Sequence, residues 1–194
     1  MDSGSDVYHP LISKVKVDDL GDFGGQTTDR QENYVRNSRE ASRFDPLVGR
    51  ILYTNAEIFG VYRPGQIRYG TEDEDMYQVG DRVCPSGTIG VRVRPLDCFM
   101  RHGKPAQDFT IRYPSEFKKI GDGKGRWYFF AWHTNDVIVQ WIIIDLDKLR
   151  KTKLLEESNT GWNTDGGEFR WILKNSLYEW RCIVRDEQLW LHTP

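Results

Sequence analysis

Charged side chains that could act on a phosphate ester are concentrated in one stretch of this sequence, which begins at Asp81. Asp81 could hold a divalent metal ion, since Mg²⁺ is bound through carboxylate oxygens. Arg92, Arg94 and Arg112 could hold a phosphate group and the negative charge that develops when it reacts. An acid followed by such cations on adjacent strands is typical of metal-assisted phosphodiester hydrolysis. The same layout could also bind a phosphate backbone without cutting it.

We expect three consecutive strands to position these side chains along one shared face. Apolar and polar residues alternate over residues 88–94 and again over 108–112, which is the period-two pattern of a strand with one polar face. Pro85, Ser86 and Gly87 predict the turn between the first two strands. The residues expected to point outward on the shared face are Thr88, Gly90, Arg92, Arg94, Asp108, Thr110 and Arg112.

The order of three short segments resembles the core of PD-(D/E)XK nucleases, in particular that of small phage-type members. These segments are Gln78–Val83, Arg92–Arg94 and Asp108–Arg112. The resemblance continues through two apolar blocks and a short motif near the C-terminus, so it covers roughly residues 72 to 190. The later parts are residues 127–132, 141–150 and 166–169.

The resemblance implies both a fold and an activity. The implied fold is α/β (α+β), with a mixed central β-sheet flanked by helices in a restriction-endonuclease-like core. The implied activity is Mg²⁺- or Mn²⁺-dependent hydrolysis of DNA, in which Asp81 anchors the metal ion and the metal activates a water molecule. Arg94 and Arg112 would bind the phosphate, and Arg92 would take the place of the family's lysine.

The chain departs from the family in the second motif, which is Glu, Asp or Gln, then any residue, then Lys. The alternation of the strand puts those positions on Gly90 and Arg92. Arg92 keeps the positive charge but is a poorer proton donor and acceptor than lysine, and Gly90 supplies no metal ligand. Asp108 on the neighbouring strand, or Glu32 on a preceding helix, could supply the missing oxygen.

Two other functions stay open. A protein of the same fold without catalysis would bind nucleic acid through Arg92, Arg94 and Arg112, or would bind a protein, and would need no metal. A virion structural protein or a host inhibitor would instead use a tryptophan-rich surface as a protein interface.

Each candidate residue also has a purely structural explanation. Asp81 is suited to accept hydrogen bonds in a turn. Arg92 and Arg94 could form a solvated strand face, or pair with the acidic run at residues 72–75, and such exposed pairs contribute little to stability. Glu32 could face solvent on an exposed helix.

Composition limits the class of protein. The 194 residues fit one domain at 29–194 that follows a polar, glycine-rich lead-in at 1–28, and 38% hydrophobic residues are enough for a core. The net charge of −2 gives no support for a strongly basic protein, so cations that bind DNA must be concentrated locally. A homo-oligomer is compatible with the sequence.

The cysteines and the apolar segments bear on location. Cys84, Cys98 and Cys182 are odd in number and widely spaced, which fits neither a disulfide framework nor a zinc site. We therefore expect a reducing, cytoplasmic environment, either in a cell or after synthesis by a virus inside one. No apolar stretch reaches transmembrane length and no signal pattern is present, so we expect no membrane partner.

Strands and helices are predicted along the rest of the chain. Residues 127–132 and 137–144 are nearly continuous apolar runs, so we expect two strands that are buried on both faces. Their tryptophans belong in the core, whereas Trp162 falls in a predicted loop and is suited to stack on a base. The other expected elements are a helix at 30–43 ended by Pro46, a strand or two within 47–69, a helix at 146–155 capped by Asp145, and a C-terminal strand, helical turn at Leu177 and last strand at 181–184.

Overall fold

Two long strands, β7 (Trp127–Thr134) and β8 (Val137–Asp145), form the centre of the fold. Their apolar sequence predicted burial on both faces, and the computed structural model, which describes residues 43–70, 81–163 and 166–188, confirms it. The strands pair antiparallel around a tight turn in which Asn135 and Asp136 have φ values of 46° and 65°. Short polar residues tolerate this left-handed backbone, so a tight turn can form here.

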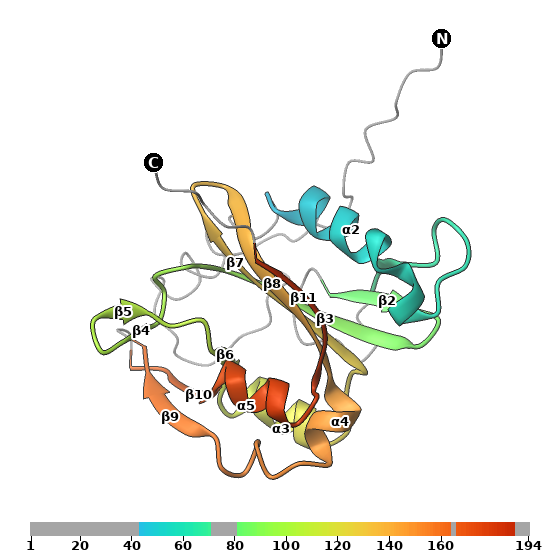
Figure 1. Cartoon of the computed structure of the whole chain (residues 1–194). Coiled ribbons are helices and arrows are strands. Elements are labelled where there is room, and N and C mark those ends of the chain that lie inside the picture. The colour runs from blue at the N-terminus through green and yellow to red at the C-terminus, as the bar shows by residue number, and fades with distance from the viewer. Residues whose placement is uncertain (1–42, 71–80, 164–165, 189–194) are drawn as a thin grey trace, which may run out of the picture. The chain divides into compact units, whose positions relative to one another are not determined.

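The central sheet is mixed and has the strand order β1-β2-β3-β7-β8-β11 (Figure 1). Strand β3 (Gly87–Pro95) pairs antiparallel with β2 (Arg82–Cys84) through the predicted turn, and parallel with β7. Two parallel neighbours cannot be joined by a tight turn, so residues 96–126 form a long connection between β3 and β7. The edge strands of the sheet are β1 (Arg68–Tyr69) and β11 (Ile183–Gln188).

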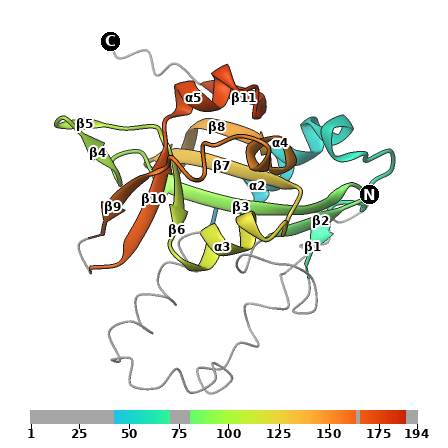
Figure 2. The same ribbon diagram turned by 90° about the horizontal axis from the view of Figure 1, so that it is seen from below.

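The long connection and the C-terminal part of the chain build a second, smaller sheet. Its antiparallel strands have the order β6-β10-β9, and Figure 2 shows them running across the strands of the central sheet. A separate hairpin joins β4 to β5. The bounds are β4 (Met100–Arg101), β5 (Lys104–Pro105), β6 (Phe109–Arg112), β9 (Asn159–Trp162) and β10 (Glu168–Ile172).

Helices cover both faces of the central sheet (Figures 1 and 2). One face packs against α2 and η2, and the other packs against α3, α4, α5 and strand β6. The fold is therefore α+β, with a central mixed sheet flanked by a few helices, as the sequence predicted. The helices are α2 (Asp45–Thr54), the 3₁₀ helix η2 (Ala56–Phe59), α3 (Ser115–Gly121), α4 (Leu146–Arg150) and α5 (Lys174–Glu179).

Helices α2 and η2 replace most of the strand structure predicted for residues 47–69. Pro46 lies in the first turn of α2, where its missing N–H costs no hydrogen bond. Val48 and Leu52 are four residues apart and bury one face of the helix against the sheet. The helix predicted at 30–43 lies outside the described residues, except for Arg43.

The C-terminal predictions are confirmed with changed bounds. Asp145 caps α4 as expected, because its side chain accepts a hydrogen bond from the Lys148 N–H at 2.9 Å, but the helix ends at Arg150 rather than at residue 155. Strand β10, helix α5 around Leu177 and strand β11 follow in the predicted order. No helix in the described ranges is long and apolar enough to span a membrane.

The prediction that β6 would lie in one sheet with β2 and β3 is wrong. Alternation shows which residues of a strand share a face, but it does not identify the neighbouring strand. Here β6 lies over the face of β3 that was expected to be open, since Phe109 packs against Tyr128 and Phe130 of the central sheet at ring separations of 5.2 Å and 5.6 Å. Polar residues of β3 therefore face a second layer of the protein instead of solvent.

Candidate functional site

Arg92 lies at the centre of a buried cluster of charged residues between the two layers. Its Nη1 is 3.0 Å from Oε2 of Glu116 on α3, and the two side chains are 4% and 2% exposed. The same nitrogen donates a hydrogen bond to the Thr110 carbonyl of β6 at 3.0 Å. Glu116 also accepts a hydrogen bond from the Arg112 backbone N–H at 3.0 Å. One guanidinium therefore links β3 to both β6 and α3.

Asp81, the residue just before β2, forms a hydrogen bond with β3. Its Oδ1 accepts a hydrogen bond from the Val91 N–H at 2.8 Å, and the residue is fully buried. The position of this carboxylate, immediately before β2, places it beside the segment that holds Gly90 and Arg92. The structure thus brings Asp81 next to the two positions that the resemblance assigned to the second motif.

The electrostatics of the cluster follow from burial and from its opposite charges. Burial alone would lower the pKa of Arg92, but Tyr128, Glu116 and Asp81 raise it above its usual value. Burial, followed by the like charge of Arg92, lowers the pKa of Arg94 to about 10. Burial also raises the pKa of the Tyr128 hydroxyl above its usual value.

Several polar atoms of the cluster are not satisfied by the protein. Within the described part of the chain, Arg92 Nη2, Glu116 Oε1 and Thr110 Oγ1 are buried and make no hydrogen bond. Buried polar groups are rarely left in this state, so each such atom calls for an explanation.

The carboxylates of the described residues do not fit the divalent ion that the resemblance implies. Mg²⁺ needs several oxygen ligands in near-octahedral geometry. One oxygen of Asp81 already accepts from Val91, and Glu116 already neutralises Arg92. Over residues 43–70, 81–163 and 166–188, no three His, Cys, Asp or Glu side chains are placed to hold a metal ion together. Glu32, the other predicted ligand, lies outside those ranges.

The remaining predicted residues lie in other surroundings. Asp108 is buried but contacts a different set of groups: its Oδ1 accepts from the Lys174 N–H at 3.1 Å, and its Oδ2 is 3.4 Å from Arg101 Nη2. Arg94 is half-buried, and Arg112 has an exposed side chain. Of the cations predicted to hold a phosphate, only Arg112 is exposed, and the outward face predicted for Arg92 is closed.

Sequence reasoning missed Glu116. It lies on helix α3, residues 115–121, for which no helix was predicted from the sequence. The spacing between Glu116 and Ile120 contained a usable signal, because residues four apart share one face of a helix and both are buried here. A carboxylate on the buried face of a helix needs a cation opposite it, and Arg92 is that cation.

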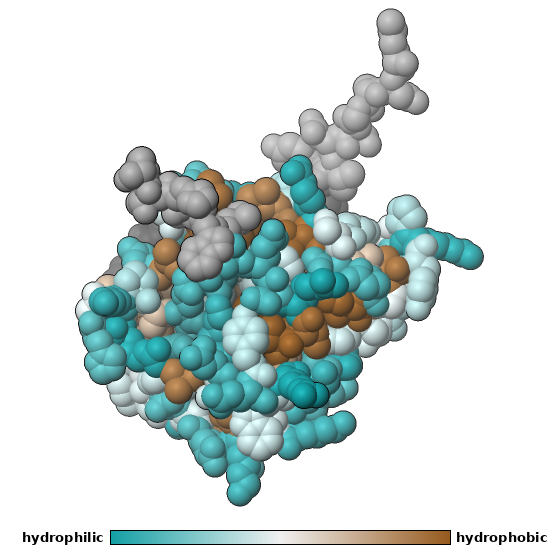
Figure 3. Space-filling view, viewed as in Figure 1, coloured by the Kyte–Doolittle hydropathy of each residue, from teal (hydrophilic) through white to brown (hydrophobic). Residues whose placement is uncertain are grey.

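An open groove of about 600 Å³ lies on the small sheet, between the β4–β5 hairpin and strands β9 and β10. Trp162 is 67% exposed at its rim. The Arg101 guanidinium lies 5.5 Å from the ring centre of Trp171, which also contacts Phe99. In Figure 3, small hydrophobic spots lie among hydrophilic residues on the side of β4, β5 and β9. The groove therefore combines exposed aromatic surface with cationic side chains.

The floor of the groove is set by a close approach of two strands. Gly161 of β9 faces Phe169 of β10, and a Cβ atom at position 161 would lie 2.4 Å from Phe169 Cζ. Only glycine leaves room for the Phe169 ring at this point. The ring in turn packs edge-on against Phe99, with ring centres 5.5 Å apart, so the aromatic floor is held in place.

Comparison of the chain with protein-family models, with curated proteins and with solved structures finds no match. The PD-(D/E)XK resemblance stays a prediction, and the function has to be argued from the geometry of the cluster and of the groove.

Proposed function

We propose that the protein binds single-stranded nucleic acid along the groove of the small sheet. The observation that carries this proposal is the exposed Trp162 at the rim of a groove whose floor holds Arg101 over Trp171. Proteins that hold single strands combine aromatic rings, on which bases stack, with cations that attract the phosphates. A large aromatic side chain that is two-thirds exposed has no role in the core and is available for such stacking.

The charge of the groove supports the same proposal. Arg101 and His102 line it, and Lys104 lies in the adjoining hairpin. The chain as a whole has a net charge of −2, so this local concentration of cations matters more than the overall balance. Arg92, which the sequence placed first among the candidate cations, is buried in its pair with Glu116 and does not reach solvent.

Binding to labelled oligonucleotides, measured by fluorescence anisotropy, tests the proposal. We expect single-stranded DNA or RNA to bind more tightly than a duplex of the same sequence, with an affinity that falls as salt rises. Trp162→Ala removes one stacking platform and should weaken binding by about 1–3 kcal/mol, which is roughly five- to 150-fold. Trp162 is exposed, and so is Trp180, which serves as the control below, so an alanine substitution at either position should change stability by no more than about 0.5 kcal/mol.

Trp180→Ala is the matched control, because Trp180 is also exposed, at 56%, but does not line the groove. It should bind like the unaltered protein. Equal losses in the two variants, or no loss in Trp162→Ala, would contradict the proposal. If this chain binds no oligonucleotide but captures another protein, that result would instead favour the protein-interaction function.

Metal-dependent hydrolysis of DNA, the activity implied by the resemblance, is the second candidate. The hydrogen bond between Val91 and Asp81 favours it, because it places an acid beside Gly90 and Arg92. The described carboxylates do not fit a metal ion, which is why we propose binding first. Incubation with supercoiled plasmid and with single-stranded DNA, in Mg²⁺, Mn²⁺ or EDTA, separates the two functions, since binding alone leaves the DNA uncut.

A further inference from the structure

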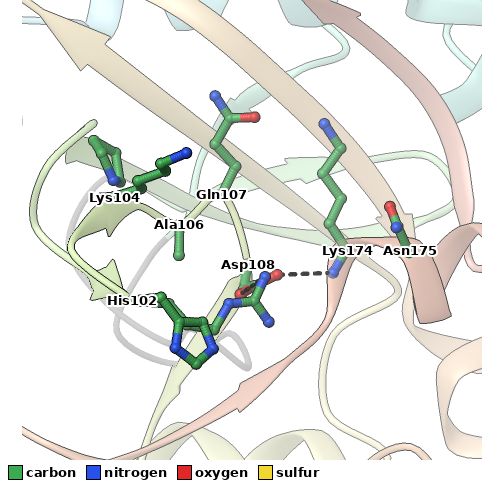
Figure 4. A pocket seen from close by; sticks show the side chains of 9 residues that line it. His102, Lys104, Ala106, Gln107, Asp108, Lys174 and Asn175 are labelled. Carbon is green, nitrogen blue, oxygen red and sulfur yellow. Dashed lines mark hydrogen bonds and ion pairs between the residues drawn. The ribbon is translucent and has the colours of Figure 1, made fainter.

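A second, smaller pocket of about 390 Å³ adjoins the groove. Arg101 and His102 line both, so the two hollows are neighbours that share these two residues. Figure 4 shows the side chains of Lys104, Gln107 and Lys174 extending to the same side of this pocket, with Asp108 between His102 and Lys174. These groups come from the β4–β5 hairpin, from the segment before β6 and from the first residue of α5, so the fold gathers them from separate parts of the chain.

The pocket has an excess of positive charge. Arg101, Lys104 and Lys174 line the pocket together with the carboxylate of Asp108, and a second carboxylate, that of Asp186, acts on Lys174. Asp108 is buried and held by Arg101 and by the Lys174 backbone N–H, so it neutralises one cation and fixes its place. The three cations outnumber the two carboxylates, so the pocket stays positively charged, and the His102 ring and the Gln107 amide can add hydrogen bonds. Such a set of donors suits a doubly charged anion.

The Lys174 side chain is half-buried among other groups of the protein. Burial lowers the pKa of its amine, although Asp186 and Asp108 act in the opposite direction. A half-buried ammonium group has lost part of its water shell, and it gains more from a bound anion than a fully solvated lysine does. The ring of Tyr178 lies 5.7 Å from Lys174 Nζ and restricts one side of the group.

We propose that this pocket receives the terminal phosphate of a strand whose bases stack in the groove. The inference rests on the proposed function, since the strand must already lie along the groove. A terminal phosphate monoester carries a charge of about −1.5 to −2 at neutral pH, whereas an internal diester carries a single charge. The three cations of the pocket therefore attract a doubly charged strand end more strongly than a singly charged diester of its interior.

Oligonucleotides of one sequence with a 5′-phosphate, a 3′-phosphate or two hydroxyl ends test this inference in the anisotropy assay. One phosphorylated form should bind about tenfold more tightly than the hydroxyl form, as expected for charge-assisted hydrogen bonds to a buried cation. Lys174→Gln should remove most of that advantage while leaving the affinity for the hydroxyl oligonucleotide nearly unchanged. Lys151→Ala, an exposed lysine that does not line the pocket, is the matched control and should keep the advantage.

The outcomes separate this inference from the proposed function. If all three oligonucleotides bind equally and Trp162→Ala weakens their binding, the groove binds nucleic acid. The inference that the smaller pocket receives a terminal phosphate is then overturned. The same conclusion follows if Lys174→Gln weakens every oligonucleotide by the same factor. If none of the oligonucleotides binds, the proposed function fails and the phosphate pocket fails with it.

Discussion

Two arginines of this protein, Arg92 and Arg101, both pair with carboxylates but serve different ends. Arg92 is 4% exposed and its partner Glu116 is 2% exposed, whereas the Arg101 side chain is 37% exposed and lies 3.4 Å from Asp108. The first pair is closed between two layers of the fold. The second borders a groove and a pocket. The comparison shows that a charged residue within a suggestive motif can be structural, while a charged residue in a plain hairpin is the accessible one.

The physical reason for the difference is desolvation. A buried ion pair loses the hydration of both charges, so removing one partner leaves the other charge uncompensated in a dry environment. In the second pair only the Arg101 side chain keeps part of its hydration, because Asp108 is buried, so Arg101 alone stays accessible to a ligand. We therefore expect substitutions in the cluster to change the free energy of unfolding and substitutions in the groove to change binding.

The largest effect is expected for Arg92. Arg92→Leu leaves the Glu116 carboxylate buried without its cation, and should lower the free energy of unfolding by about 3–5 kcal/mol. Urea denaturation measures the change. The double variant Arg92→Leu with Glu116→Leu removes both charges and should regain most of the loss, because apolar pairs often replace buried ion pairs without cost. A loss below about 1 kcal/mol in the single variant would mean that the Arg92–Glu116 pair contributes no more to stability than an exposed ion pair does.

A smaller effect is expected for Asp81. Asp81→Ala removes the acceptor of the Val91 N–H and should cost about 1–3 kcal/mol, while Asp81→Asn keeps an acceptor and should cost less. Urea denaturation again gives the values. The same two variants sharpen the comparison in the plasmid assay. Metal-dependent cutting by the unaltered protein that is lost in a folded Asp81→Asn variant would make the cluster catalytic, whereas no cutting leaves binding at the groove as the function.

The smallest effect is expected at the pair of Arg126 and Asp145 beside α4, in which Asp145 is buried and Arg126 is partly exposed. Burial alone would raise the pKa of Asp145, but hydrogen bonds from Arg126 and from the Lys148 N–H hold it below its usual value. The pair therefore stabilises the fold at pH values above the ordinary pKa of the carboxyl group, and this contribution is lost as pH falls through the lowered pKa.

Asp145→Asn keeps the helix cap and removes the charge. It should cost about 1 kcal/mol at neutral pH, and the difference from the unaltered protein should shrink on acidification, as urea titrations at several pH values would show. A difference that stays constant down to pH values at which carboxylates are protonated would mean that the charge of Asp145 does not contribute.

The central strands could be predicted from the sequence because their signal is local. The runs at 127–132 and 137–144 are apolar over more residues than a half-buried strand needs, and the polar turn between them has residues that tolerate positive φ. Helix α2 was missed because Pro46 was taken as a stop, although proline is also common in a first turn. The exposure predicted for Trp162 is confirmed, although it lies on β9 rather than in a loop.

The candidate site was harder to predict because its contacts are not local. Arg92 and Glu116 belong to different layers, and no pattern within either segment indicates that they meet. The alternation of β3 correctly put Arg92 and Arg94 on one face, but it could not reveal that β6 and α3 cover that face. The groove is formed by the same connection together with β9 and β10, so it too depends on the packing of distant segments.

The parallel pairing of β3 with β7 has a consequence for how this protein can vary. The connection at residues 96–126 carries β4, β5, β6 and α3, and with them one wall of the groove and part of the phosphate pocket. Doubling the length of a flexible loop adds only about 0.6 kcal/mol to its closure entropy. Insertions at the β4–β5 tip could therefore reshape what is bound while the six-stranded sheet keeps its register, which makes recognition and folding separately evolvable in one chain.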